Sequence, residues 1–117
     1  SPKALISPTA QLNEGCIVQS FCHVSAHARI GKGVKMSVYA NVMHDVSIAN
    51  YVTIAPGAIL LGNVQVGEGA YIGAGAVVLP RIKIGKGAIV GAGAVVTKNV
   101  EDGITVVGVP ATKMLHH

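Results

Sequence analysis

Aliphatic side chains recur in this sequence at every sixth position. An apolar residue stands at each multiple of six from Ile6 to Val96, and Asp102 is the first exception. A small residue, often Ala, stands two places before most of these positions. The period excludes an amphipathic helix, whose apolar stripe recurs about every 3.6 residues. It is typical of a repeat protein in which each repeat contains one short strand.

Glycines mark turns between these expected strands. Some follow the aliphatic residue directly, as Gly73 follows Ile72 and Gly91 follows Val90. Others stand three places after it, where we expect a turn with positive φ. This second set comprises Gly33, Gly57, Gly69, Gly75, Gly87 and Gly93. Each six-residue repeat is therefore predicted to be a short strand followed by a turn.

This repeat strongly resembles that of the hexapeptide-repeat acyltransferases. The resemblance implies an all-β fold, a left-handed parallel β-helix in which three hexapeptides form one triangular coil, with coils about 4.8 Å apart. The sixteen apolar positions from Ile6 to Val96 then give about five coils. We expect residues 1–103 to form this β-helix, and residues 104–117 to form a C-terminal tail that folds back over the last coil.

The three faces of such a prism differ in polarity. Residues eighteen apart share a face, and the face that carries Leu60 and Val78 has apolar residues outside as well as inside. Its outward residues include Ile59, Leu61, Val77, Leu79 and Val95. An apolar stripe of this kind is unusual on a soluble monomer and predicts a subunit interface. The resemblance implies three copies around a threefold axis, so we expect a homotrimer.

Composition narrows the classes of partner. The 117 residues include three Tyr, one Phe and no Trp, and this scarcity of aromatic side chains argues against nucleic-acid binding. The formal net charge of +4 suits an anionic ligand such as a nucleotide, but a modest charge also serves solubility alone. Cys16 and Cys22 occupy small-residue positions of the repeat, so we expect packed thiols, neither a disulfide nor a metal pair. No apolar run could span a membrane and no signal peptide is visible, which favours a cytoplasmic protein.

Three histidines away from the C-terminal end are candidate functional residues: His23, His27 and His44. The γ-class carbonic anhydrases resemble this repeat and bind zinc through three His, but here the spacing brings no such set together, and we expect no metal. His44 stands in the turn after the apolar face, beside Asp45. A turn His is commonly a solvated surface residue, but an acidic neighbour orients an imidazole and raises its basicity.

The segment from Met43 to Met114 is similar to the catalytic half of the nucleotide-amino-sugar N-acetyltransferases and the related sialic acid O-acetyltransferases. The His-Asp, Ile-Ala-Pro-Gly, Ile-Gly-Ala-Gly-Ala and Gly-Val-Pro-Ala pieces occur in the order expected for that family. The resemblance implies acetyl-CoA as donor, a nucleotide-linked amino sugar as acceptor, His44 as general base and Asp45 as the residue that tunes it. It also implies an N-terminal sugar-nucleotide-binding domain that this sequence does not include.

Two alternatives remain open at this point: O-acetylation of a sialic acid or similar sugar, and a non-catalytic solenoid that serves trimer assembly. One departure bears on the acceptor, because Met36 to Tyr39 replaces a stretch that commonly contains Asn-Thr in the family.

Further site residues follow from the eighteen-residue spacing and from the resemblance. Gly62 stands eighteen residues after His44, and its unhindered N–H is a candidate donor to an oxyanion, although a tight turn also favours glycine there. For CoA, small residues at the corners and on the adjoining face offer a smooth wall, and two lysines are candidates for its phosphates or are solvated surface residues. These CoA candidates are Thr53, Gly73, Ala74, Gly91, Ala92, Lys98 and Lys113.

Overall fold

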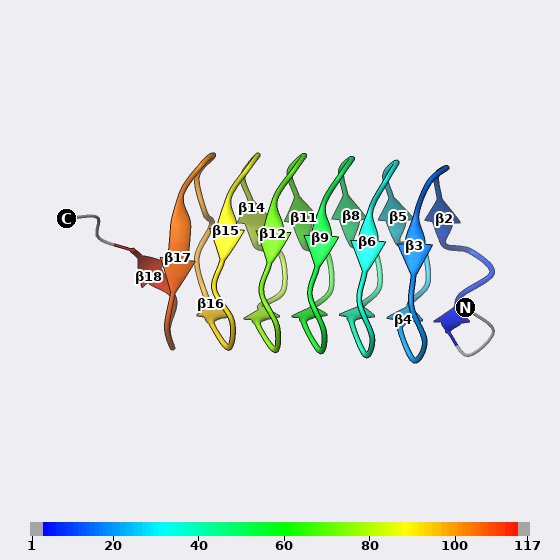
Figure 1. Ribbon diagram of the computed structural model, residues 1–117, viewed down its shortest axis with the longest axis horizontal. Helices are drawn as coiled ribbons and strands as arrows, with labels where there is room; N and C mark the ends of the chain where they lie inside the picture. Colours follow the sequence, from blue (N-terminus) through cyan, green and yellow to red (C-terminus); the bar gives the residue numbers. More distant parts are fainter. Residues whose placement is uncertain (1–3, 115–117) are drawn as a thin grey trace.

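A computed structural model describes residues 4–114, and within them every helix or strand assigned is a β-strand (Figure 1). The strands form three sheets, and from β1 to β16 each sheet takes every third strand of the chain. Sheet A contains β1 (Leu5–Ile6), β4 (His23–Val24), β7 (Asn41–Val42), β10 (Ile59–Leu60), β13 (Val77–Val78) and β16 (Val95–Val96). Sheet B contains β2 (Gln11–Leu12), β5 (Arg29–Ile30), β8 (Ser47–Ile48), β11 (Gln65–Val66) and β14 (Lys83–Ile84). Sheet C contains β3 (Ile17–Val18), β6 (Lys35–Met36), β9 (Thr53–Ile54), β12 (Tyr71–Ile72), β15 (Ile89–Val90), β17 (Thr105–Val107) and β18 (Thr112–Lys113).

Successive coils stack along the long axis of the molecule (Figure 1). Strand β10 pairs in parallel with β7 and β13, and Ile59 lies beside Asn41 on one side and Val77 on the other. These partners are eighteen residues apart, as the resemblance to the hexapeptide-repeat acyltransferases implies. Strands β1 to β15 make five complete coils, and β16 and β17 belong to a sixth. The predicted three-sided parallel β-helix is therefore confirmed.

The core is the column of inward residues that the six-residue pattern specifies. Each multiple of six from Val24 to Val96 is buried, together with the small residue two places before it. The first coil differs, because it has a neighbour on one side only. Ile6 is 42% exposed there, although it occupies a core position of the repeat. Burial thus depends on having a coil above and a coil below, which no local pattern encodes.

The turns between strands use the left-handed backbone region at a constant place. All six predicted glycines have positive φ, with values between 63° and 72°. At the equivalent position of other repeats the structure has residues with side chains, also at positive φ. These are Phe21, His27, Tyr39, Asp45, Tyr51, Asn63 and Arg81. The coil therefore requires positive φ at this position whichever residue occupies it. Glycine lowers the conformational energy of the turn but is not needed for the turn to form.

The last coil departs from the six-residue beat. Val100 bridges to Ile84 and Val106 pairs with Val90, each sixteen residues on instead of eighteen. The region predicted as a tail thus supplies β17, a further parallel strand of sheet C. Strand β18 then runs antiparallel to β17 and lies at the C-terminal end of the stack (Figure 1).

The two cysteines are both free thiols. Cys22 is buried in the core, and its Sγ donates to the carbonyl oxygen of Ser37 at 3.0 Å. Burial raises the pKa of the Cys22 thiol, which therefore stays protonated. Cys16 is half-buried near the first coils. Both behave as small packed residues, as predicted.

The turn geometry gives a prediction about stability. Gly87 has a φ of 63°, and a Cβ added there would meet no atom within 4 Å. The Gly87→Ala variant should therefore lose about 1–2 kcal/mol of unfolding free energy from backbone strain alone. Chemical denaturation measures this loss, with Lys86→Ala as the control because Lys86 is exposed and lies outside the positive-φ set. Equal stability of the two variants would contradict the assignment of strain.

Candidate active site

His44 and Asp45 form an exposed pair at the corner between sheets A and B. His44 Nδ1 lies 3.2 Å from Asp45 Oδ2, and the two side chains are 58% and 51% exposed. Because a carboxylate only accepts hydrogen bonds, the neutral imidazole donates from Nδ1 and leaves its lone pair on Nε2. Asp45 adopts a φ of 57°, which the turn imposes. The sequence neighbours thus form the oriented pair that the sequence predicts.

Gly62 lies directly against this imidazole, one coil further along. A Cβ at position 62 would come within 2.5 Å of His44 Nε2 and 2.6 Å of Cε1. Gly62 is outside the positive-φ set, and the left-handed residue of its turn is Asn63. The tight turn is therefore not the reason for glycine here. Glycine is required at position 62 because any side chain there would occupy the space of the His44 ring. The sequence alone did not reveal this reason.

The backbone of Gly62 keeps an unused donor beside that ring. Its carbonyl oxygen accepts from the Arg81 amide at 3.0 Å, while its own N–H has no hydrogen-bond partner among residues 4–114. A base with a lone pair on Nε2 and a backbone donor thus lie within one corner of two successive coils. Such an arrangement can accept a proton from a nucleophile and stabilise negative charge on an adjacent oxygen.

The residues predicted to line a CoA wall lie around the corner between sheets C and A. Ala74 and Ala92 are exposed there, and within residues 4–114 their amides have no hydrogen-bond partner. Thr53 is half-buried on the adjoining sheet C. Gly73 is buried, and a Cβ there would lie 2.6 Å from the amide nitrogen of Ala92. At Gly91, the added Cβ would lie 2.8 Å from a Val107 methyl group. Close packing against the next coil therefore explains why positions 73 and 91 are glycine, independently of any role in CoA binding.

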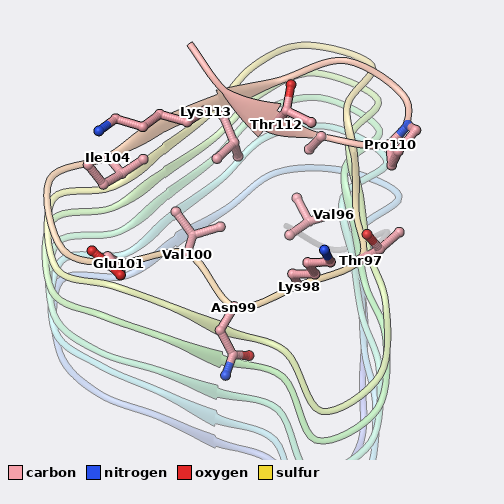
Figure 2. A pocket seen from close by; sticks show the side chains of 12 residues that line it. Val96, Thr97, Lys98, Asn99, Val100, Glu101, Ile104, Pro110, Thr112 and Lys113 are labelled. Carbon is pink, nitrogen blue, oxygen red and sulfur yellow. The ribbon is translucent and has the colours of Figure 1, made fainter. Parts of the chain in front are cut away.

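Lys98 and Lys113 line one cavity of about 460 Å³ at the C-terminal end of the β-helix. Figure 2 shows side chains of the last coil on one side of it and those of the β18 segment on the other. Apolar residues of the last coil, including Val96 and Ile104, form part of its lining. Lys98 stands fifty-four residues after His44, three coils along the same corner. At the usual spacing of parallel strands this amounts to about 14 Å.

The outer surface of sheet A, called face A below, carries the predicted apolar stripe. Its aliphatic residues from Ile59 to Val95 are half-buried in the single chain, because side chains of successive coils stack against one another. Asn41 precedes them on this face, and its Oδ1 atom is buried without a hydrogen-bond partner in residues 4–114. An unpaired buried acceptor is uncommon and calls for a partner. The sequence pattern did not single out Asn41 for this role.

Two aromatic residues form a further feature that sequence reasoning missed. The rings of Phe21 and Tyr39 are stacked, with centroids 5.1 Å apart and planes inclined by 10°. Their spacing of eighteen residues is the signal that could have revealed the stack, because it places both in one column.

Two other classes of site receive no support from the described chain. No three His, Cys, Asp or Glu side chains gather as metal ligands between residues 4 and 114. In the same residues no helix is long and apolar enough to cross a membrane.

Comparison with known proteins gives matches in sequence and in structure. Residues 63–98 match the family model described as bacterial transferase hexapeptide (six repeats). No curated protein gives a significant match in sequence. The GDP-perosamine N-acetyl transferase of Caulobacter crescentus, as a histidine-to-alanine mutant with CoA and GDP-perosamine, has a TM-score of 0.97 and 36% identity. This match covers 98% of the present chain and 55% of the Caulobacter chain.

Two further solved structures match the chain. The acetyltransferase domain of PglB from Neisseria gonorrhoeae, in complex with acetyl coenzyme A, has a TM-score of 0.96 and 38% identity, with 97% of this chain and 55% of that chain covered. WeeI from Acinetobacter baumannii has a TM-score of 0.71 and 39% identity, with coverages of 95% and 57%. The chain thus spans about half the length of the solved proteins that it matches. With the repeat, the coil and these similarities together, the chain belongs to the hexapeptide-repeat acetyltransferase family.

Proposed function

We propose that this chain is the catalytic domain of an acetyltransferase that acetylates the amine of a nucleotide-linked amino sugar. The observation that carries the proposal is the geometry around His44. Its Nδ1 atom faces Asp45, and its Nε2 atom lies over a glycine whose amide is unpaired in residues 4–114. A solenoid that served assembly alone would have no use for this combination of base, orienting carboxylate and donor.

The reaction in this proposal is direct transfer of an acetyl group. Acetyl-CoA supplies the activated acetyl thioester. His44 Nε2 takes a proton from the acceptor amine as its nitrogen attacks, and Asp45 stabilises the imidazolium that forms. The Gly62 N–H donates to the carbonyl oxygen on which negative charge develops in the tetrahedral intermediate. This intermediate collapses by breaking its C–S bond, so the acetyl group stays on the amine nitrogen and CoA leaves as a thiolate that takes the proton from the His44 imidazolium. His44 and Gly62 face each other without another residue of the chain between them, as such a division of roles needs.

Groups that fit CoA lie at both edges of face A, with Ala74 and Ala92 at one corner and Lys98 at the other. Ala74 and Ala92 present unpaired amides on a corner without bulky side chains, which suits a narrow pantetheine arm with amide groups. Lys98 and Lys113 meet at a single cavity and suit the phosphates of its nucleotide end. This cavity lies about 14 Å beyond His44, as three coil spacings require, so the nucleotide and the thioester can occupy different coils of one groove.

The groove is completed by a second copy of the chain. Within one chain, His44 and Ala74 lie at opposite edges of face A, because strand β10 and its neighbours run between these two corners. Three copies that pack their faces A around a threefold axis bring one subunit's His44 edge to the next subunit's Ala74 edge. The apolar stripe and the unpaired Asn41 oxygen on face A support this trimer.

The acceptor class rests on the relatives. The Caulobacter protein is named a GDP-perosamine N-acetyl transferase and binds that sugar nucleotide together with CoA. This similarity favours an amine acceptor over the hydroxyl of a sialic acid, the second candidate in the same class. An enzyme that draws on acetyl-CoA in this way is expected to work in the cytoplasm.

Removal of the base should abolish most of the activity. His44→Ala should lower kcat for acetyl transfer by about 10²- to 10⁴-fold, because general-base catalysis contributes that much. Steady-state transfer from acetyl-CoA to a panel of UDP-, GDP- and dTDP-linked amino sugars measures it. His27→Ala is the control, since His27 is an exposed histidine at the same corner between sheets A and B, one coil before Asp45. Undiminished transfer by His44→Ala would reject the catalytic proposal in favour of a scaffold.

Gly62→Ala extends the same test. Its Cβ would displace the imidazole, so kcat should fall by about a hundredfold while acetyl-CoA affinity stays within a factor of about two. Retained kcat would remove Gly62 from the site.

Charge placed on face A should dissociate the trimer. The double variant Ile59→Glu, Val77→Glu puts carboxylates into the proposed interface, where each unpaired ion costs several kcal/mol. Sedimentation velocity should show a trimer for the parent and a monomer for this variant. The control, Gln11→Glu with Gln65→Glu, adds the same two negative charges at exposed positions of sheet B. A monomeric parent protein would rule out the shared groove.

The lysine cavity should contribute to donor binding. Lys98→Gln and Lys113→Gln should each weaken acetyl-CoA affinity about fivefold at low salt, with a smaller effect at high salt. Calorimetric titration measures both, and Lys83→Gln on sheet B is the control. Unchanged affinity in both variants would leave these residues as solvated surface lysines.

A further inference from the structure

The stacked rings of Phe21 and Tyr39 form an exposed aromatic surface at the corner between sheets C and A. Phe21 is 47% exposed and Tyr39 62%, and both hold positive φ, which bulky residues rarely adopt. We propose that Tyr39, supported by Phe21, is the acceptor wall of the active site and stacks against the sugar ring that carries the amine. This inference rests on the proposed acetyltransferase function and on its trimer.

The column that contains these rings changes character along the β-helix. Residues eighteen apart at this corner are Phe21, Tyr39, Gly57, Gly75 and Gly93, all at positive φ. The column thus has aromatic side chains in the N-terminal coils and only glycine, without a side chain, in the C-terminal coils. The bare part adjoins Ala74 and Ala92, the wall proposed for the pantetheine arm. The donor thus occupies the C-terminal part of the groove and leaves the aromatic part for the acceptor.

Tyr39 stands at the height of the proposed base. His44 follows it by five residues, less than a third of a coil, so the two lie within about 2 Å of each other along the axis. In one chain they are at opposite edges of face A, with strand β7 between them. A threefold axis parallel to the β-helix preserves height. It therefore places Tyr39 of one subunit across the groove from His44 of the neighbouring subunit, at the same level.

This height selects the part of the acceptor that meets the ring. The attacking amine must approach within about 3 Å of His44 Nε2, so the sugar that carries it occupies the same level as Tyr39. A nucleobase also stacks well on aromatic rings, but it is separated from the amine by the sugar and the diphosphate. An uncharged aromatic face suits the C–H face of a pyranose, and the Tyr39 hydroxyl offers a hydrogen bond at its edge.

Glycine at position 39 provides a test that should leave the fold intact. A φ of 62° suits glycine, and the same column carries glycine in later coils. With GDP-perosamine or a dTDP-linked amino sugar of the panel as acceptor, whichever gives the higher kcat/KM, Tyr39→Gly should raise the acceptor KM about tenfold. The acetyl-CoA KM should stay within about twofold, and Tyr39→Phe should keep most of the acceptor affinity. The matched control is Tyr51→Gly, because Tyr51 has a φ of 59° and is 63% exposed at a different corner.

The possible results distinguish a failure of the acceptor wall from a failure of the proposed acetyltransferase function. Wild-type transfer that depends on His44, with equal acceptor KM values for Tyr39→Gly and Tyr51→Gly, would overturn the acceptor wall alone. Inhibition by free GDP or dTDP should be unaffected by Tyr39→Gly, and a tenfold weaker inhibition would assign the ring to the nucleobase and overturn the sugar contact. No transfer by the wild type to any amino-sugar nucleotide of the panel would reject the function, and the acceptor wall with it.

Discussion

The structure depends on one constraint, the parallel hydrogen bonding of each strand to the strands eighteen residues before and after it. The amide of Ile59 donates to the carbonyl of Ala76 at 2.8 Å, and the amide of Asn41 donates to Ala58 at 2.9 Å. Repeated at every coil, these bonds hold residues eighteen apart about one strand spacing from each other. The inward residues then close into a dry column of Val, Ile, Leu and Ala, which supplies the apolar burial that stabilises the coils.

The stacking of coils brings together residues that are far apart in the sequence, and the candidate active site is formed by such residues. His44 and Asp45 are neighbours in the chain, but the ring of His44 acquires its setting only from Gly62 in the next coil. The two lysines of the terminal cavity likewise come from different segments, because β18 turns back beside the last coil. Each column can change residue type from coil to coil without disturbing the backbone. The corner residues can therefore vary and provide functional groups, while the inward residues of the core keep the same pattern in every coil.

The corners are also where the backbone is strained. From Gly15 to Gly93 each turn has one residue at positive φ, and glycine is the residue that adopts this conformation most easily. Where an aromatic side chain occupies such a turn, as at Tyr39 and Tyr51, the backbone strain needs compensation by contacts. Tyr51 obtains a contact within the chain, since its ring packs over Gly33. Tyr39 obtains a contact as well, since its ring stacks on that of Phe21.

The sequence alone determined the six-residue period, the strand positions, the inward residues and the pairing of His44 with Asp45, and the resemblance to the hexapeptide-repeat acyltransferases supplied the coil length. These features are readable because each depends on residues at a constant separation along the chain. Tertiary structure decided the rest: why position 62 is glycine, which lysines share a cavity, that Phe21 and Tyr39 stack, and that the last coil closes two residues early. Their physical reason is common to all four. Each arises from atoms that meet only after the coil has closed, and the apolar pattern near Val100 and Val106 fits more than one register until the strands of the preceding coil select one.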